Sequence, residues 1–137
     1  MKVSAIFSLA TLLSVAAADT VSYDPGYDIG DRSLTKLTCS DGKNGLMTRF
    51  GWKKQSDIPH FPFIGGAPGI SWNSPNCGKC WSLEYDGHKI FVLGVDTSTN
   101  GFNIGQKAMD ALTNGHSVEL GRVDAKATAV AAKNCGL

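Results

Sequence analysis

The clearest alternation of apolar and polar residues lies between residues 81 and 95. Trp81–Tyr85 alternates, Asp86-Gly87 is a favoured two-residue turn, and His88–Val95 is a strong β-type run. This pattern predicts a β-hairpin. Gly94 interrupts the second strand and indicates a bulge or a close backbone approach directly before Asp96.

One stretch carries apolar residues at helical spacing. They fall at i, i+4, i+7 and i+8, in Ile104, Ala108, Ala111 and Leu112. Asn103 stands at the N-cap position with Gln106 three residues later, and Asn114-Gly115 supplies a stop signal. The pattern predicts one helix that begins after Asn103.

The rest of the chain predicts short β-strands joined by turns. Expected strands are residues 20–23, 46–50, 118–123 and 125–130, and a half-turn is expected near Leu34 and Leu37 within a loop over residues 27–40. Residues 52–72 are rich in glycine, proline and aromatic side chains and predict an irregular apolar loop that packs against the body. Many short strands with one helix indicate a small β-barrel or β-sandwich.

The chain begins with a segment typical of secretory signal peptides. Basic Lys2 precedes an apolar run over residues 3–15, and Ala16-Ala17-Ala18 fits the small-residue cleavage pattern. We therefore predict a signal peptide over residues 1–18 and one domain over residues 19–137. The apolar run is too short and too interrupted for a membrane anchor, so a secreted protein is expected, with no membrane partner.

Charge disfavours a nucleic-acid or anionic-membrane partner. The whole chain has 13 basic and 12 acidic residues, and loss of Lys2 leaves 12 of each, a formal net charge of zero. A neutral balance provides no electrostatic attraction to phosphates. It suits recognition of a neutral ligand such as a polysaccharide.

Four cysteines in an exported chain indicate two disulfides, and three pairings are possible. The Cys77-Gly78-Lys79-Cys80 spacing also occurs in redox motifs, but Pro75 and the β-type run that follows disfavour the helix that such motifs open. A thiolate zinc site is disfavoured because Cys39 and Cys135 stand alone. The three histidines are scattered, so we expect neither a metal nor a cofactor.

Several motifs, in order along the chain, resemble the cerato-platanin family of small proteins secreted by filamentous fungi. They are Ser22-Tyr23-Asp24, Cys39-Ser40-Asp41-Gly42 with Asn44-Gly45-Leu46, Phe63-Ile64-Gly65-Gly66, Trp72-Asn73-Ser74-Pro75-Asn76-Cys77-Gly78-Lys79-Cys80-Trp81, Gly94-Val95-Asp96 and Gly101-Phe102-Asn103. Ser71 and Asn100 replace glycines that are common in the family, and both lie in turns where serine and asparagine are accepted.

The resemblance implies a fold and a disulfide pairing. The fold is a six-stranded double-ψ β-barrel with one or two short helices, similar to barwin and to the first domain of expansins. The implied disulfides are Cys39 to Cys77 and Cys80 to Cys135. Similar proteins are non-catalytic, bind chitin oligomers, loosen cellulose in an expansin-like way, self-assemble at interfaces, and act as elicitors of plant defence or as virulence factors.

Asp96 is the first candidate for the binding site. The apolar strand before it is expected to deliver it to one end of the barrel, and in related expansins and family 45 endoglucanases a comparable aspartate lies in the glycan groove. The competing interpretation is an aspartate that caps a turn with Thr97 or Ser98. The resemblance favours a carbohydrate-binding role.

Asn103, Tyr23 and Asp24 complete the predicted carbohydrate-binding set. Asn103 fits an N-cap, and the family pattern also places it beside the groove. Tyr23 and Asp24 belong to the set by resemblance. Any of the three tryptophans could stack on a sugar ring, although core packing is the favoured interpretation for Trp81.

The sequence thus predicts a secreted, monomeric, non-catalytic protein that binds chitin or β-glucan oligosaccharides, in the cell wall or outside the cell. Glycoside hydrolysis normally needs two positioned carboxyl groups, so Asp96 would need a partner. The candidate partners fit other tasks, because Asp24 and Asp86 fit turns and Glu84 fits a solvated strand face. A weak β-glucan hydrolase, related to family 45 endoglucanases, is therefore only the alternative. A further role is recognition by a host plant receptor through exposed loops such as residues 27–36.

Overall fold

The computed structural model describes residues 18–137, which include the six strands of one closed β-barrel. The strands are β1 (Ala18–Tyr23), β2 (Ile64–Ala67), β3 (Cys80–Tyr85), β4 (His88–Thr97), β5 (Phe102–Ile104) and β6 (Arg122–Val130). Around the barrel their order is β1-β5-β2-β4-β3-β6. Two of the neighbouring pairs, β1–β5 and β2–β4, are parallel. This confirms the six-stranded double-ψ β-barrel.

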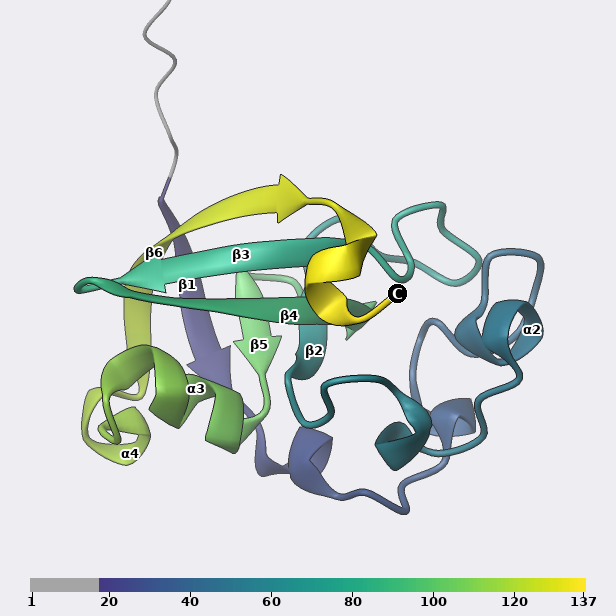
Figure 1. Cartoon of the computed structure of the whole chain (residues 1–137), viewed down its shortest axis with the longest axis horizontal. Coiled ribbons are helices and arrows are strands. Elements are labelled where there is room, and N and C mark those ends of the chain that lie inside the picture. The colour runs from purple at the N-terminus through teal and green to yellow at the C-terminus, as the bar shows by residue number, and fades with distance from the viewer. Residues whose placement is uncertain (1–17) are drawn as a thin grey trace, which may run out of the picture.

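Short helices surround the barrel (Figure 1). The α-helices are α2 (Leu46–Phe50), α3 (Gln106–Thr113) and α4 (Ser117–Leu120), and the 3-10 turns are η1 (Pro25–Asp28), η2 (Leu34–Lys36), η3 (Gln55–Asp57) and η4 (Ala132–Cys135). Figure 1 shows the segment between β1 and β2, which contains α2, as a lobe beside the barrel. The predicted signal peptide falls on residues 1–17, which lie outside the described part, and on Ala18, where β1 begins.

The predicted hairpin is confirmed. β3 and β4 pair in antiparallel register from Cys80↔Leu93 to Tyr85↔His88, around Asp86-Gly87. The irregularity expected at Gly94 is also present, because Gly65 pairs with Gly94 whereas Gly66 pairs with Asp96. Val95 is therefore an extra residue in β4, and this bulge directly precedes Asp96.

Two disulfides have the implied pairing, Cys39 to Cys77 and Cys80 to Cys135. They close loops with sequence separations of 38 and 55 residues. All four cysteines lie within the described residues, and none of them is free. Cys77 and Cys80, three positions apart, therefore belong to different crosslinks. The alternative that they form a redox-active pair, which the sequence disfavours, is wrong.

The strand predicted at residues 46–50 is wrong, because this segment forms the single turn of α2. Leu46 is fully buried, and Gly51 ends the helix in the left-handed conformation at φ 74°. Glycine in that conformation is the common end of a helix. In the sequence, Gly51 after the five residues is the signal for a helix end. A short apolar–polar run does not by itself distinguish a strand from one helical turn.

The segment predicted to be irregular contains the strand β2. Its residues are all buried, and Gly65 and Gly66 lie where a Cβ atom would approach the carbonyl oxygens of Asn103 and Thr97 at 2.4 and 2.5 Å. The two glycines thus allow close packing of neighbouring backbones. In the sequence they look like loop residues.

The predicted N-cap at Asn103 is also wrong. Asn103 lies in β5, and α3 begins at Gln106 after Gly105. The amides of Gln106 and Lys107 donate to the carboxylate of Asp28, at 2.6 and 3.1 Å. This cap comes from η1, 78 residues away in sequence, so no local pattern could indicate it.

The two closing strands predicted over residues 118–123 and 125–130 are one continuous strand, β6, preceded by α4. Gly121 has φ 69° and separates the helix from the strand. The Asp110 carboxylate accepts from the amide of Ser117, at 3.1 Å, which fixes the start of α4. Position 124 does not interrupt the strand, because Asp124 pairs with Thr20 of β1.

Candidate functional site

A row of polar side chains crosses the barrel wall. Gly66 of β2 pairs with Asp96 of β4 on one side and with Asn103 of β5 on the other, and Asn103 pairs with Ser22 of β1. Ser22 in turn pairs with Arg122 of β6. Several of their neighbours in the strands are buried in the core, namely Val95, Phe102, Ile104, Val21 and Val123. The row therefore faces outward, with Gly66 contributing no side chain between Asp96 and Asn103.

Asp96 is held by four hydrogen bonds. Its Oδ1 accepts from the backbone amide of Thr38 at 2.9 Å, from the Thr38 hydroxyl at 2.6 Å and from the amide of Thr97 at 3.0 Å. Its Oδ2 accepts from the Tyr27 hydroxyl at 2.8 Å. A carboxylate has about four lone-pair sites, so most of its accepting capacity is used within the protein. Asp96 fastens η1 and the segment before Cys39 to the end of β4.

Tyr27 completes this cluster in a buried position. Burial raises the pKa of the Tyr27 phenol above its ordinary value, and the charge of Asp96, the hydrogen bond to it, and the charge of Asp24 act in the same direction. The Arg32 guanidinium lies over the Tyr27 ring at 5.5 Å and acts in the opposite direction. The phenol is thus a stable hydrogen-bond donor to Asp96 near neutral pH.

Asn103 lines a cavity of about 420 Å³ on the other side of Gly66. The walls are Ser22, Thr97, Ser98, Thr99, Asn100, Asn103 and Arg122. The Asn103 Oδ1 accepts from the Ser22 hydroxyl at 3.0 Å, which leaves the amide nitrogen free to donate to a ligand. Among the described residues, all lining side chains are polar, one of them is the cationic Arg122, and none is acidic.

The four predicted binding residues occupy different parts of this region. Asn103 lines the polar cavity, and Asp96 lies one residue before its Thr97 wall. Tyr23 ends β1, and Asp24 caps η1 by accepting from the amide of Gly26 at 2.8 Å. The Asp24 amide donates to the carbonyl of Ile104 at 2.8 Å, so Asp24 lies beside β5, next to the residue that follows Asn103. Tyr23 and Asp24 are not among the cavity-lining residues.

The tryptophans lie away from the polar cavity. Trp81 packs on the core edge-to-face with Phe102 at 5.2 Å, as expected, and Trp52 stacks on Phe50 at 4.2 Å. Trp72 is 59% exposed, and its indole N–H donates to Asp41 at 2.7 Å. This hydrogen bond lowers the pKa of the Asp41 carboxyl. Among residues 18–137, no aromatic side chain lines the polar cavity, so any sugar bound there is held by hydrogen bonds.

Sequence reasoning missed several members of the site. Thr38 and Tyr27 are brought to Asp96 from distant segments, Arg32 lies over the Tyr27 ring, and Arg122 belongs to β6. The polar run Thr97–Asn100, directly after the predicted strand, was a local signal that could have identified one cavity wall. No group of three metal-ligating side chains occurs in the described part of the chain, and no helix there is long and apolar enough to cross a bilayer.

The closed mixed barrel, its two disulfides and the outward polar row define a class of small crosslinked double-ψ β-barrel proteins. The cerato-platanin family profile matches residues 19–137. The chain therefore belongs to the cerato-platanin family.

Relatives and solved structures agree with this assignment. The chain is 46% identical over 132 residues to the heat-stable 19 kDa antigen of Coccidioides immitis, which covers 96% of this chain and 88% of the relative. The crystal structure of cerato-platanin 3 from M. perniciosa has a TM-score of 0.83 at 43% identity, covering 88% of this chain and 99% of the other. The solution structure of the fungal elicitor Cerato-Platanin has a TM-score of 0.76 at 39% identity, covering 85% and 95%.

Proposed function

We propose that this protein is a secreted, non-catalytic binder of neutral wall glycans, chitin or β-glucan oligosaccharides. The observation that carries the proposal is the cavity beside Asn103, whose lining offers hydroxyl, amide and guanidinium groups and no carboxylate. Sugar hydroxyls donate and accept hydrogen bonds, and such side chains satisfy both. The net charge of zero after signal cleavage also suits an uncharged polymer.

The arrangement of acidic groups favours binding over hydrolysis. A glycosidase needs one carboxylic acid to protonate the leaving oxygen and a second carboxyl group as base or nucleophile. Asp96 accepts four hydrogen bonds and Asp24 caps η1, so both have structural tasks. A binding protein needs only complementarity to the ground state of the sugar.

The alternative, a weak β-glucan hydrolase, is tested by product formation. Incubation with β-glucan and with chitin oligomers is expected to yield no new reducing ends above a buffer control. New reducing ends that disappear in an Asp96→Asn variant would replace the binding proposal with a hydrolase.

Binding itself is tested at Asn103. Asn103→Ala removes the free amide donor and is expected to weaken chito-oligosaccharide binding about tenfold in calorimetry, because a neutral hydrogen bond contributes about 1 kcal/mol and its loss leaves a polar group unpaired. Thr128→Ala is the matched control, since Thr128 is exposed on β6 outside the cavity. Equal affinities for the two variants would refute the assignment of the site.

A second candidate function is recognition by a host receptor as an elicitor. The solved relative described as a fungal elicitor makes this role relevant, and Ile29, in the loop after η1, is 51% exposed. Exchange of residues 29–36 for the equivalent loop of a non-eliciting relative, which keeps Tyr27 and Asp28, is expected to abolish a leaf defence response while glycan binding persists. An unchanged response would exclude this loop as the receptor contact.

A further inference from the structure

A second and larger cavity, with no lining residue in common with the cavity at Asn103, lies along one edge of β4. Its volume is about 790 Å³, and its walls come from the loop before β2, from β4, from α3 and from η4. The lining residues are His60, Phe61, Phe63, Gly87, His88, Lys89, Ile90, Phe91, Ala111 and Asn134. None of these residues belongs to the predicted glycan site.

The first half of β4 has one unpaired edge facing this cavity. Residues His88–Val92 pair with β3 alone within the described chain, since β2 joins β4 only from Leu93 onward. The Leu93 amide donates to Phe63 on the β2 side, whereas the Gly94 amide donates to Lys79 on the β3 side. Because alternate residues of a strand face opposite neighbours, the backbone groups of Lys89 and Phe91 point to the open side, as that of Leu93 does.

The backbone N–H and C=O groups of Lys89 and of Phe91 are therefore both available for pairing. They lie about 6.8 Å apart, which is the two-residue repeat of an extended chain. An extended peptide can pair with such an edge and place its side chains in flanking pockets. The loop before β2 leaves the edge free because it turns away at Phe63, whose amide donates back to His60.

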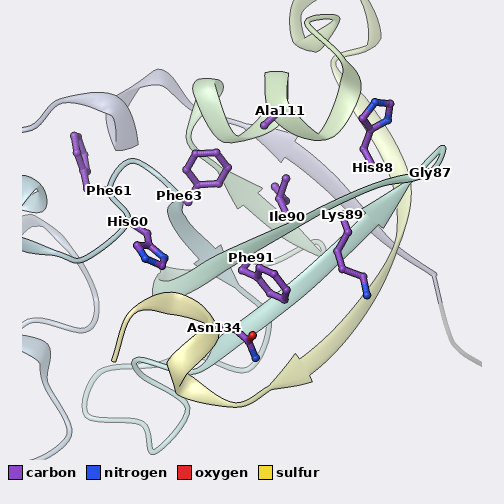
Figure 2. Close-up of a pocket in the computed structure, with 10 residues that line it drawn as sticks. All are labelled: His60, Phe61, Phe63, Gly87, His88, Lys89, Ile90, Phe91, Ala111 and Asn134. Atoms are coloured by element: carbon purple, nitrogen blue, oxygen red, sulfur yellow. The ribbon is translucent and has the colours of Figure 1, made fainter.

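The two faces beside this edge differ in chemistry. Figure 2 shows His88 and Ile90 directed to the side of Ala111 in α3, and Lys89 and Phe91 directed to the side of Asn134. Phe63 and Ile90 make the first side mainly apolar, whereas Lys89 and Asn134 add polar groups to the second. Side chains of an added strand would alternate between these two sides.

Charge selects among the possible occupants. The lining includes Lys89 and two histidines, and among residues 18–137 no acidic side chain contributes to it. Lysine on a sheet edge disfavours pairing with a second copy, because two such edges in antiparallel pairing bring like charges together. Glu84 of β3 lies opposite Lys89, and Lys126 of β6 lies opposite Glu84 on its other side, so this row keeps a positive charge that attracts an acidic side chain of a different partner.

We propose that the β4 edge at Lys89 and Phe91 is a docking site for an extended peptide segment in which apolar and acidic residues alternate. The segment adds a strand to the barrel, its apolar side chains lie against Phe63 and Ile90, and its acidic side chains lie near Lys89. This peptide site is separate from the glycan cavity and does not depend on the glycan proposal.

The probe is the peptide acetyl-Val-Glu-Val-Glu-Val-amide, titrated into the full-length mature protein labelled with nitrogen-15. We expect amide shifts at Lys89 and Phe91. In antiparallel pairing the peptide residues opposite Lys89 and Phe91, whose side chains lie on the Lys89 side, donate to the edge, so N-methylation of the second glutamate is expected to weaken binding about tenfold. Lys89→Glu is expected to weaken binding about fivefold, whereas Lys43→Glu, a control at another exposed lysine, leaves it unchanged.

Several results would overturn the proposal. They are no binding of the peptide, equal binding of the N-methylated peptide, shifts confined to the cavity around Asn103, or equal effects of the two lysine substitutions. Decanoate is titrated in parallel. If decanoate shifts the Lys89 and Phe91 amides and the peptide does not, the cavity is a site for anionic amphiphiles instead.

Discussion

Asp96 stabilises the junction of three segments that are distant in sequence. Its carboxylate receives hydrogen bonds from Tyr27 in η1, from Thr38 before the first cysteine, and from its own neighbour Thr97. The sequence-based alternatives for Asp96 were a turn cap and a glycan contact. The hydrogen bond from Thr97 matches the cap, and a glycan contact stays a prediction.

Tyr27→Phe tests this junction without removing the carboxylate. Loss of the hydroxyl leaves one Asp96 oxygen without its donor, and a hydrogen bond to a charged group contributes about 1.5–3 kcal/mol. We expect the unfolding free energy from urea denaturation to fall by about 2 kcal/mol. Tyr85→Phe, at a partly buried tyrosine of β3, is the control and should change it by less than about 0.5 kcal/mol. Equal losses would show that the Tyr27 hydroxyl contributes nothing specific.

The same variant carries a pH signature. The pKa of the Tyr27 phenol is raised in the folded protein, first by burial and then by Asp96. The unfolded chain therefore ionises first as the pH rises above about 10, so this contribution to stability is complete below about pH 10 and declines above it. The unfolding free energy should therefore fall less between about pH 9.5 and 11 in Tyr27→Phe than in the unsubstituted protein. An unchanged fall would contradict the assigned shift.

The elements that the sequence predicts well are those defined by neighbouring residues. The β3–β4 hairpin follows from its own alternation and turn, and the bulge follows from Gly94. The start of α3 is set by Asp28, from η1, and β2 is a strand because its glycines fit between two other backbones. Such long-range contacts leave no periodic signal in the sequence. For this reason the helical spacing predicts a start of α3 that is two residues too early, and the glycine content predicts a loop where β2 forms.

Gly66→Ala tests the role of the β2 glycines. The new methyl group would approach the Thr97 carbonyl oxygen at 2.5 Å, and backbone atoms cannot move aside at low cost. We expect a loss of about 2–3 kcal/mol in unfolding free energy, measured by urea denaturation. In the control Gly30→Ala the nearest atom is the Ser56 Cβ at 3.3 Å, and the loss should be smaller. A loss at Gly66 no larger than the control would mean that β2 has room to adjust.

At the scale of the whole molecule, one barrel wall brings together groups from most of the chain. Asp96 and Asn103 were identifiable because family motifs include them, and they prove to flank the same glycine. Ser22 and Arg122 reach the row only through strand pairing around the closed barrel. Their sequence positions alone gave no reason to connect them. The disulfides join the lobe to the loop before β3, and β3 to the C-terminal turn η4.

The central claim is that a neutral glycan binds along this row without being cleaved. A nitrogen-15 NMR titration with chitin oligomers and with β-glucan oligomers tests it most directly, because it maps the surface and compares the ligands together. We predict concentration-dependent shifts at the amides of Thr97–Asn100 and Asn103, with an unchanged ligand spectrum. If saturation of the protein with either ligand produced no shifts at these amides, or produced shifts only on another face, the account would be contradicted.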